Sequence, residues 1–284
     1  LSHFFEPPHR FRRIHQLLGA RKKFSVDELA AIQLDTVSLH AKELIATLAA
    51  DFTRLSDNDP TLQWAVDRLR GWDGQCNASS VEATIFHVFH HRLLNNLLVP
   101  TLGEELFSAY VEILNQCIVP TDRILGDVHS PWFATRSRYE LVALSLREAC
   151  ADLGETLGEN AAGWEWRRIH QLEMNHPFGR FNFLKPLVNV GPLMTPGDGT
   201  TINLGFYRHS NPYLQTVGPS LRFIVETGNW EHSGFILASG QSGHPLSVHY
   251  ADQTPLWSSG KRTSLYREPE ATGPYHEGLL FKPG

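Results

Sequence analysis

The feature that most constrains the fold of this 284-residue chain is a change in residue pattern near residue 160. Before it, apolar residues recur every three or four positions, the spacing of one helix face. After it, short runs rich in Val, Ile, Phe and Tyr are broken by Gly and Pro, which is typical of strands and turns. Because helices come first and strands follow, the pattern predicts an α+β fold. We expect a helical region over residues 1–160 and a strand-rich region over residues 161–284.

Capping and turn residues place the expected elements along the chain. Two capping boxes, Ser25 with Glu28 and Ser79 with Glu82, each predict a helix start. Helices are predicted at 8–18, 25–48, 60–71, 79–98, 104–117 and 136–153. Strands are predicted at 183–190, 200–207, 221–227, 234–238, 264–267 and 278–282. The turn Pro196-Gly197-Asp198-Gly199 leads into the second of these strands.

Composition excludes two classes of partner. The chain is 42% hydrophobic and 19% charged, with a formal net charge of -5. It has no run of Lys and Arg, so we expect no nucleic-acid partner. No apolar run approaches the ~18–20 residues of a membrane span, so we expect no membrane partner either. Three widely spaced cysteines, Cys76, Cys117 and Cys150, lack a metal-ligand pattern and are expected to be buried, or to form one disulfide and leave one free thiol.

Three histidines, His87, His90 and His91, share part of one predicted helix. Positions three or four residues apart lie on the same helix face, which invites a metal-site interpretation. However, no HExxH motif and no nearby acidic residue completes a ligand set. The surrounding phenylalanines and leucines indicate a packed helix, and the sequence therefore predicts no metal site.

The segment GQSGHPLSVHYADQTPLW, Gly240–Trp257, is dense in polar side chains and turn residues. Such a loop must satisfy its polar groups internally or expose them to a ligand, and the first interpretation is favoured. Ser242, His249 and Asp252 supply the residue types of a catalytic triad, but residues so close in one loop rarely reach triad geometry. A self-contained serine hydrolase stays an alternative. Arg222 is expected to pair with an acidic neighbour.

Six motifs occur in an order that matches a known family. They are PHRFRRIHQLL (8–18), RLRGWDG (68–74), WEWRRIHQLEMNHPF (164–178), GDGTTIN (197–203), GPSLRFIVE (218–226) and GQSGHPLSVHYADQTPLW (240–257). With them, the chain resembles the C-terminal part of the β chain of the penicillin acylase (penicillin amidase) family of N-terminal-nucleophile hydrolases. The resemblance implies that the strands contribute to an αββα sandwich. It makes the late polar segments structural motifs, with Ser220, Arg222, Gly240, Gln241, Ser242, Gly243, His249, Tyr250, Asp252 and Gln253 as their members.

The resemblance also implies a mechanism. Family members hydrolyse linear amides, such as acylated β-lactams of antibiotic biosynthesis or N-acyl-homoserine lactones. The N-terminal serine of the β chain attacks the carbonyl, its own α-amino group acts as the base, and an asparagine helps to hold the oxyanion. Complete members carry structural calcium in many cases and are exported to the periplasm or beyond the cell. We expect no cofactor in this chain.

The start of the chain departs from the family pattern, since Leu1 is not a nucleophile. We therefore expect the chain to be inactive alone and to act with the remaining α and N-terminal β segments on a small N-acyl amide. Arg10 matches a functional arginine of the family and is expected to support catalysis. The alternative for Arg10 is a surface arginine that caps Glu6. Phe4 and Phe5 are expected to contribute to the acyl pocket. A non-catalytic scaffold with an acylase-like fold is the alternative function.

Overall fold

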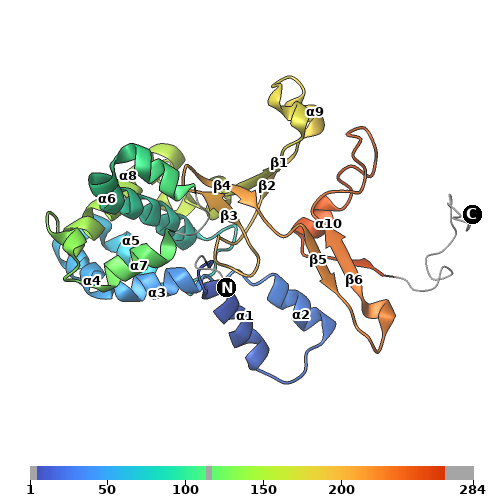
Figure 1. Cartoon of the computed structure of the whole chain (residues 1–284), viewed down its shortest axis with the longest axis horizontal. Coiled ribbons are helices and arrows are strands. Elements are labelled where there is room, and N and C mark those ends of the chain that lie inside the picture. The colour runs from blue at the N-terminus through green and yellow to red at the C-terminus, as the bar shows by residue number, and fades with distance from the viewer. Residues whose placement is uncertain (1–4, 113–116, 266–284) are drawn as a thin grey trace, which may run out of the picture. The chain divides into compact units, whose positions relative to one another are not determined.

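The structure is a computed structural model that describes residues 5–112 and 117–265. Contacts between residues divide the chain into two compact units (Figure 1). The large unit comprises residues 1–22 and 34–218, and the small unit comprises residues 23–33 and 219–284. The small unit thus combines a segment from the first part of the chain with residues from its last part.

The large unit is built on two long helices that pack against each other. α6 (Val81–Val111) and α8 (Arg138–Leu157) share the most extensive helix contact, and Phe86, Phe89 and Leu146 are fully buried there. Around them lie α3 (Leu39–Thr47), α4 (Ala49–Asn58), α5 (Pro60–Gly71) and α7 (Ile118–Gly126), and α1 (His9–Gly19) contacts α3. Short 3₁₀ turns connect some elements at Pro131–Phe133, Ala161–Gly163, Trp166–Arg168 and Pro177–Arg180.

Helix starts and ends differ from the predictions in physically clear ways. Ser80 rather than Ser79 caps α6, because its hydroxyl accepts from Ala83 N at 3.0 Å. The predicted helix 104–117 is the second part of α6, which continues past a break at Gly103 with φ of 75°. The predicted helix 25–48 is two helices, because residues 34–38 leave helical geometry and Val37 pairs with Gln75 across an antiparallel bridge.

A four-stranded sheet completes the large unit. Its strands are β1 (Gln171–Met174), β2 (Val190–Met194), β3 (Phe206–Arg208) and β4 (Asn211–Val217), in the order β2-β1-β4-β3. Only the central β1–β4 pair is parallel. The predicted strand 183–190 is wrong: these residues form α9 (Lys185–Val188), since Pro186 fits a first helical turn. The predicted strand 200–207 is mostly a loop, because residues 200–205 bond to side chains of the same loop.

The small unit contains a three-stranded antiparallel sheet. Its strands β5 (Leu221–Ile224), β6 (Gly234–Leu237) and β7 (Thr263–Ser264) lie in sequence order and confirm the predicted strands at 221–227 and 234–238. α2 (Val26–Gln33) and α10 (Thr254–Ser258) flank it, with a 3₁₀ turn at Trp230–His232. The Ser25–Glu28 capping box is confirmed by two hydrogen bonds of 2.8 and 3.2 Å. The predicted strand 278–282 lies outside the described residues.

These units confirm an α+β fold. Cys76, Cys117 and Cys150 are free thiols, so the described residues contain no disulfide. Among those residues, no helix combines the length and the apolar character needed to cross a membrane.

Candidate functional site

Arg10 lies at the edge of a cavity in the large unit. The side chain belongs to the first turn of α1, and its Nη2 donates to Ile202 O at 3.4 Å. The cavity has a volume of about 170 Å³ and is lined by Glu6, Pro7, Arg10, Gly199, Leu204, Phe206 and Val217. Its wall is mostly apolar, with one cation and one carboxylate beside it. Such a site suits an apolar group that carries a polar function at one end.

A largely buried ion pair, still partly open to solvent, fixes the helix that carries Arg10. Arg13 Nε and Nη2 donate to the two carboxylate oxygens of Asp35 at 3.0 and 2.7 Å. The two side chains are only 16% and 14% exposed. Asp35 O in turn accepts from Asn203 N at 2.9 Å. Asp35 therefore connects α1 to the loop that contains Ile202, the acceptor for Arg10.

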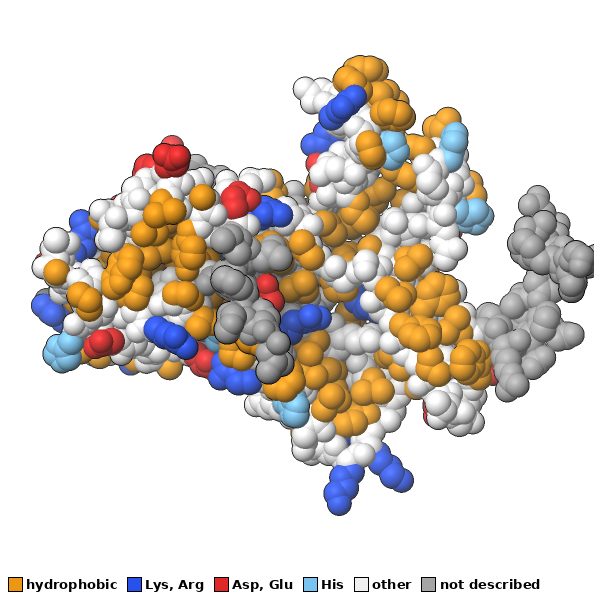
Figure 2. Space-filling model, in the orientation of Figure 1, with side chains coloured by type: hydrophobic (Ala, Val, Ile, Leu, Met, Phe, Trp, Pro, Cys, Tyr) orange, Lys and Arg blue, Asp and Glu red, His pale blue; other side chains and the backbone are white. Residues whose placement is uncertain are grey.

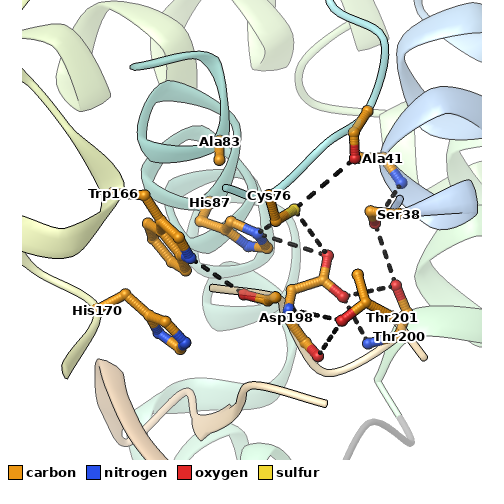
Figure 3. A network of polar contacts seen from close by, with 12 residues as sticks. Ser38, Ala41, Cys76, Ala83, His87, Trp166, His170, Asp198, Thr200 and Thr201 are labelled. Atoms are coloured by element: carbon orange, nitrogen blue, oxygen red, sulfur yellow. Dashed lines mark hydrogen bonds and ion pairs between the residues drawn. The ribbon is translucent and has the colours of Figure 1, made fainter. Parts of the chain in front are cut away.

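That loop, residues 195–205, is built around the buried carboxylate of Asp198. Asp198 is 1% exposed, and its Oδ1 accepts from Thr200 N at 2.6 Å and from Thr200 Oγ1 at 2.8 Å. Gly197 precedes it with φ of 92°, and a Cβ there would lie 2.1 Å from Asn203 O. Only glycine fits that backbone position. The turn predicted at 196–199 thus serves to place a carboxylate inside the protein (Figure 3).

Cys76 and His87 meet Asp198 from two other segments. Cys76 Sγ lies 3.6 Å from Asp198 Oδ2 and 3.9 Å from His87 Nε2, and His87 Nε2 lies 3.5 Å from Asp198 Oδ2. All three side chains are buried, and Figure 3 shows them converging. The His87 ring stacks on Trp166 with centroids 4.5 Å apart, and His87 Nδ1 is 3.0 Å from Tyr207 Oη. We call Cys76, His87 and Asp198 the buried triad.

Burial sets the protonation of this site. Burial lowers the pKa of His87 to about 4, although the charge of Asp198 opposes the shift. Burial alone would raise the pKa of Asp198, but His87 and the hydrogen bonds from Ser38 and Thr200 lower it on balance. Burial and Asp198 raise the pKa of the Cys76 thiol well above its usual value. At neutral pH the site therefore holds a carboxylate, a neutral imidazole and a thiol.

Further histidines extend the cluster along α6, since His40 and His90 line the same small cavity as His87 and Asp198. His40 Nε2 lies 3.2 Å from Asp122 Oδ1, and the ring centroids of His40 and His90 are 5.0 Å apart. Burial opposes protonation of His40, but the hydrogen bond and the charge of Asp122 outweigh it and raise the pKa. The acidic partners that the helix sequence lacks, Asp122 and Asp198, come from distant segments. For Asp198, the sequence signal was its position in the predicted turn at 196–199.

The polar loop Gly240–Trp257 lies in the small unit and is held by its own hydrogen bonds. Gly240 N donates to Tyr250 O at 2.9 Å, and Ser242 N donates to His249 O at 3.0 Å. His249 Nδ1 lies 2.8 Å from Asp252 Oδ2. Ser242 Oγ accepts from His244 N at 3.1 Å and forms no hydrogen bond with the His249 ring in the described structure. The loop thus contains a histidine–aspartate pair without an attached nucleophile.

Residues around this loop tie it to the small sheet. Gln253 Oε1 accepts from Leu237 N at 3.0 Å, and Ser220 O accepts from Ala238 N at 3.3 Å. Arg222 Nη1 donates to Trp257 O at 2.7 Å, and the guanidinium lies 4.8 Å from the centre of the Trp257 ring. Burial lowers the pKa of Arg222 to about 10. Gln241 lines an open hollow with Ser242, Ser247, His249, Asp252 and Gln253, and a Cβ added at Gly243 would meet no atom within 4 Å.

The sequence predicted that Phe4 and Phe5 contribute to an acyl pocket. Phe4 lies outside the described residues. Phe5 is 69% exposed and is not among the residues that line the cavity beside Arg10. Leu204 and Phe206, which the sequence did not single out, supply apolar walls instead.

Comparisons with known proteins give a consistent result. The chain matches the family model for penicillin amidase over residues 1–272. It is 29% identical to acyl-homoserine lactone acylase QuiP of Pseudomonas aeruginosa, over 95% of this chain and 36% of that protein. It is 31% identical to penicillin acylase 2 proenzyme of a Pseudomonas species, over 89% of this chain and 32% of that protein. The chain thus spans about a third of the length of these curated relatives.

A solved structure shows the same fold. The thermostable penicillin G acylase from Alcaligenes faecalis superposes with a TM-score of 0.57 over 99% of this chain and 54% of that one. The sequence identity of the pair is 15%, so the likeness concerns the fold alone.

Proposed function

Because the chain belongs to the penicillin amidase family, we propose that it is part of an amidohydrolase that cleaves linear amides. Family relatives are named as acylases, enzymes that hydrolyse amide bonds. The activity belongs to the whole protein, of which this chain supplies a C-terminal portion. Arg10 at the rim of an apolar cavity is the observation on this chain that carries the proposal.

We assign the chemical steps to two parts of the protein. A serine at the N-terminus of a segment outside this sequence attacks the amide carbonyl, with its α-amino group as base. The C–N bond breaks, the protonated amine leaves, and water then hydrolyses the acyl-enzyme ester. Arg10 contributes a permanent positive charge beside the cavity, where it orients the groups that hold the oxyanion. The Arg13–Asp35 pair keeps α1, and with it Arg10, in position.

The apolar cavity favours an apolar acyl group. Leu204, Phe206 and Val217 offer a hydrophobic wall of the kind that binds a hydrocarbon chain or ring. An N-acyl amide fits this surface, with the acyl group against the wall and the amide near Arg10. Among the relatives' named substrates, both the acyl-homoserine lactones and the penicillins are of this class.

Exposed apolar faces of each unit suit burial against the rest of such a protein. In β5, Leu221 and Phe223 point outward and are 51% and 49% exposed, whereas Ile224 is buried. In the large unit, the arm at residues 175–189 carries Phe183 and Leu187 with exposures of 76% and 65%. Figure 2 shows hydrophobic side chains gathered over this arm. Patches of this kind mark interfaces more often than solvent-facing surface.

Calcium and export are part of the same proposal. Calcium takes several oxygen ligands, whereas the one ligand cluster of the described residues includes a thiol and an imidazole. We therefore place a structural calcium in the remainder of the protein. We also propose a periplasmic or extracellular location, in line with the resemblance.

The test compares this chain with the complete protein. The 284-residue chain and the processed precursor that contains it are assayed with N-acyl-homoserine lactones of increasing chain length and with a penicillin. We expect amide hydrolysis, with release of the free amine, only from the complete protein. Activity of the isolated chain would contradict the division of roles. A correctly processed, folded protein that hydrolyses none of these amides would favour the scaffold alternative.

A further inference from the structure

We propose that the buried triad of Cys76, His87 and Asp198 is a structural zinc site that joins three segments of the large unit. Cys76 belongs to the loop between α5 and α6, His87 to the second turn of α6, and Asp198 to the loop between β2 and β3. Sulfur, imidazole nitrogen and carboxylate oxygen are all ligands of zinc in proteins. The sequence had predicted no metal here, because the carboxylate is 111 positions away from the histidine.

The spacing of the three ligand atoms fits one tetrahedral ion. Zinc bonds of about 2.3 Å to sulfur and about 2.0–2.2 Å to nitrogen and oxygen give ligand–ligand edges of roughly 3.3–3.6 Å. The observed separations are 3.5, 3.6 and 3.9 Å. Shifts of the three side chains by a few tenths of an ångström, which their rotamers allow, would bring all three ligand atoms to bonding distance from one ion.

The other polar atoms of the ligands are already held by neighbours. Asp198 Oδ1 accepts two hydrogen bonds from Thr200, which leaves Oδ2 for the metal. His87 Nδ1 faces Tyr207 Oη at 3.0 Å, so the tyrosine accepts from Nδ1–H when Nε2 binds the ion. Cys76 is fixed through its backbone, whose N donates to Thr36 O and whose O accepts from Gly197 N. Supporting contacts of this kind orient metal ligands in known sites.

Charge balance also favours the ion at this depth. When zinc binds, the Cys76 thiol releases its proton to solvent, and the two charges of the ion are matched by one thiolate and one carboxylate. The imidazole stays neutral, so the buried site carries no net charge. An uncompensated charge at this depth would be costly, and Cys76, His87 and Asp198 are 0%, 4% and 1% exposed.

A small cavity beside the triad provides a fourth position. It has a volume of about 20 Å³ and is lined in part by His87, His90 and Asp198, enough for one water molecule. His90 is 3% exposed, and its Nε2 has no hydrogen-bond partner in the described part of the chain. A metal-bound water there would donate to this nitrogen. Because no substrate reaches so enclosed a site, the role of the ion is structural.

Cobalt substitution tests the proposal directly. The complete protein is purified without metal-affinity steps, treated with chelator and titrated with Co²⁺. We expect one equivalent per chain to produce a thiolate-to-cobalt charge-transfer band and the strong visible bands of tetrahedral cobalt. Zinc should displace the cobalt and raise the unfolding midpoint of the chelated protein by about 1–3 °C at a 100-fold excess over its Kd. Absence of the charge-transfer band in the folded wild-type protein would overturn the proposal.

Variants locate the ion and keep the test decisive. Cys76→Ser should remove the charge-transfer band, whereas Cys150→Ser, a change on α8, should retain it. Tyr207→Phe keeps the ring and loses only the hydroxyl, so we expect zinc affinity to fall by about 10–100-fold without loss of fold. If Cys76→Ser fails to fold, the cobalt spectrum of the wild-type protein and the zinc affinity of Tyr207→Phe still test the proposal. Cobalt bands that persist in folded Cys76→Ser, or an unchanged affinity in Tyr207→Phe, count against the site.

Discussion

Replacement of Arg13 by methionine should destabilise the large unit far more than the same change at Arg12. Arg13 forms two hydrogen bonds with Asp35, and both side chains are about five-sixths buried. Arg12 forms one contact of 2.7 Å with Glu43, and these side chains are 44% and 48% exposed. The two arginines are neighbours on α1, so helix propensity and side-chain length are matched.

The magnitude follows from what each change leaves behind. Removal of one member of a buried pair costs about 3–5 kcal/mol, because the partner charge stays buried. Asp35 keeps a hydrogen bond from Val37 N at 3.2 Å and some contact with solvent, so we expect a smaller cost of about 2–3 kcal/mol, just below that range. For Arg12→Met we expect less than about 1 kcal/mol, as for other exposed pairs.

Urea unfolding followed by circular dichroism measures both effects. Arg13→Met should lower the free energy of unfolding by the larger amount, and a variant that also carries Asp35→Asn should lose less than the sum of the two changes. Because Asp35 also binds Asn203 N, we expect kcat of the complete protein to fall in Arg13→Met through displacement of Arg10. Equal, small losses of stability for Arg12→Met and Arg13→Met would refute the reasoning.

Three further predictions concern catalysis, pH and backbone geometry. In the complete protein, Arg10→Lys should lower kcat by about 10–100-fold with an unchanged urea midpoint, since lysine lacks the planar fork; an unchanged kcat would make Arg10 a surface residue. Burial lowers the pKa of His91 to about 4 and of His170 to about 3, against 6.5 when unfolded. The unfolded state therefore binds more protons, and each group should remove up to about 1.4 kcal/mol of stability per pH unit as pH falls below 6.5. His91→Gln should weaken the pH dependence of the unfolding midpoint between pH 6.5 and 4. An unchanged slope of midpoint against pH would exclude His91 as a contributor. Gly197→Ala should cost roughly 2 kcal/mol or more in urea unfolding because of its positive φ, whereas Gly71→Ala, with open space around it, should be near neutral; similar midpoints for both would contradict this.

Local sequence patterns determined much of the secondary structure. The Ser25–Glu28 box starts α2 as predicted, and β5 and β6 lie within predicted strands. These elements depend on interactions between residues close in sequence, such as side-chain caps and alternating burial, and such signals can be read locally. Predictions failed where contacts between residues far apart in sequence determined the backbone conformation. Residues 34–38 leave the helix to bridge to Gln75, and residues 200–205 form a loop around Asp198 instead of a strand.

The same distinction between local patterns and distant contacts applies to the candidate sites. The motifs in the sequence predicted the family, which the family model confirms, and named Arg10 as a candidate site residue, because they are short contiguous patterns. The apolar wall beside Arg10 and the acidic partner of His87 were not predictable, since Phe206 and Asp198 reach those places through the path of a loop. Whether a buried histidine has a carboxylate beside it depends on packing between segments more than 100 positions apart. The sequence thus determined the family and the local elements, and the tertiary structure decided which polar side chains meet.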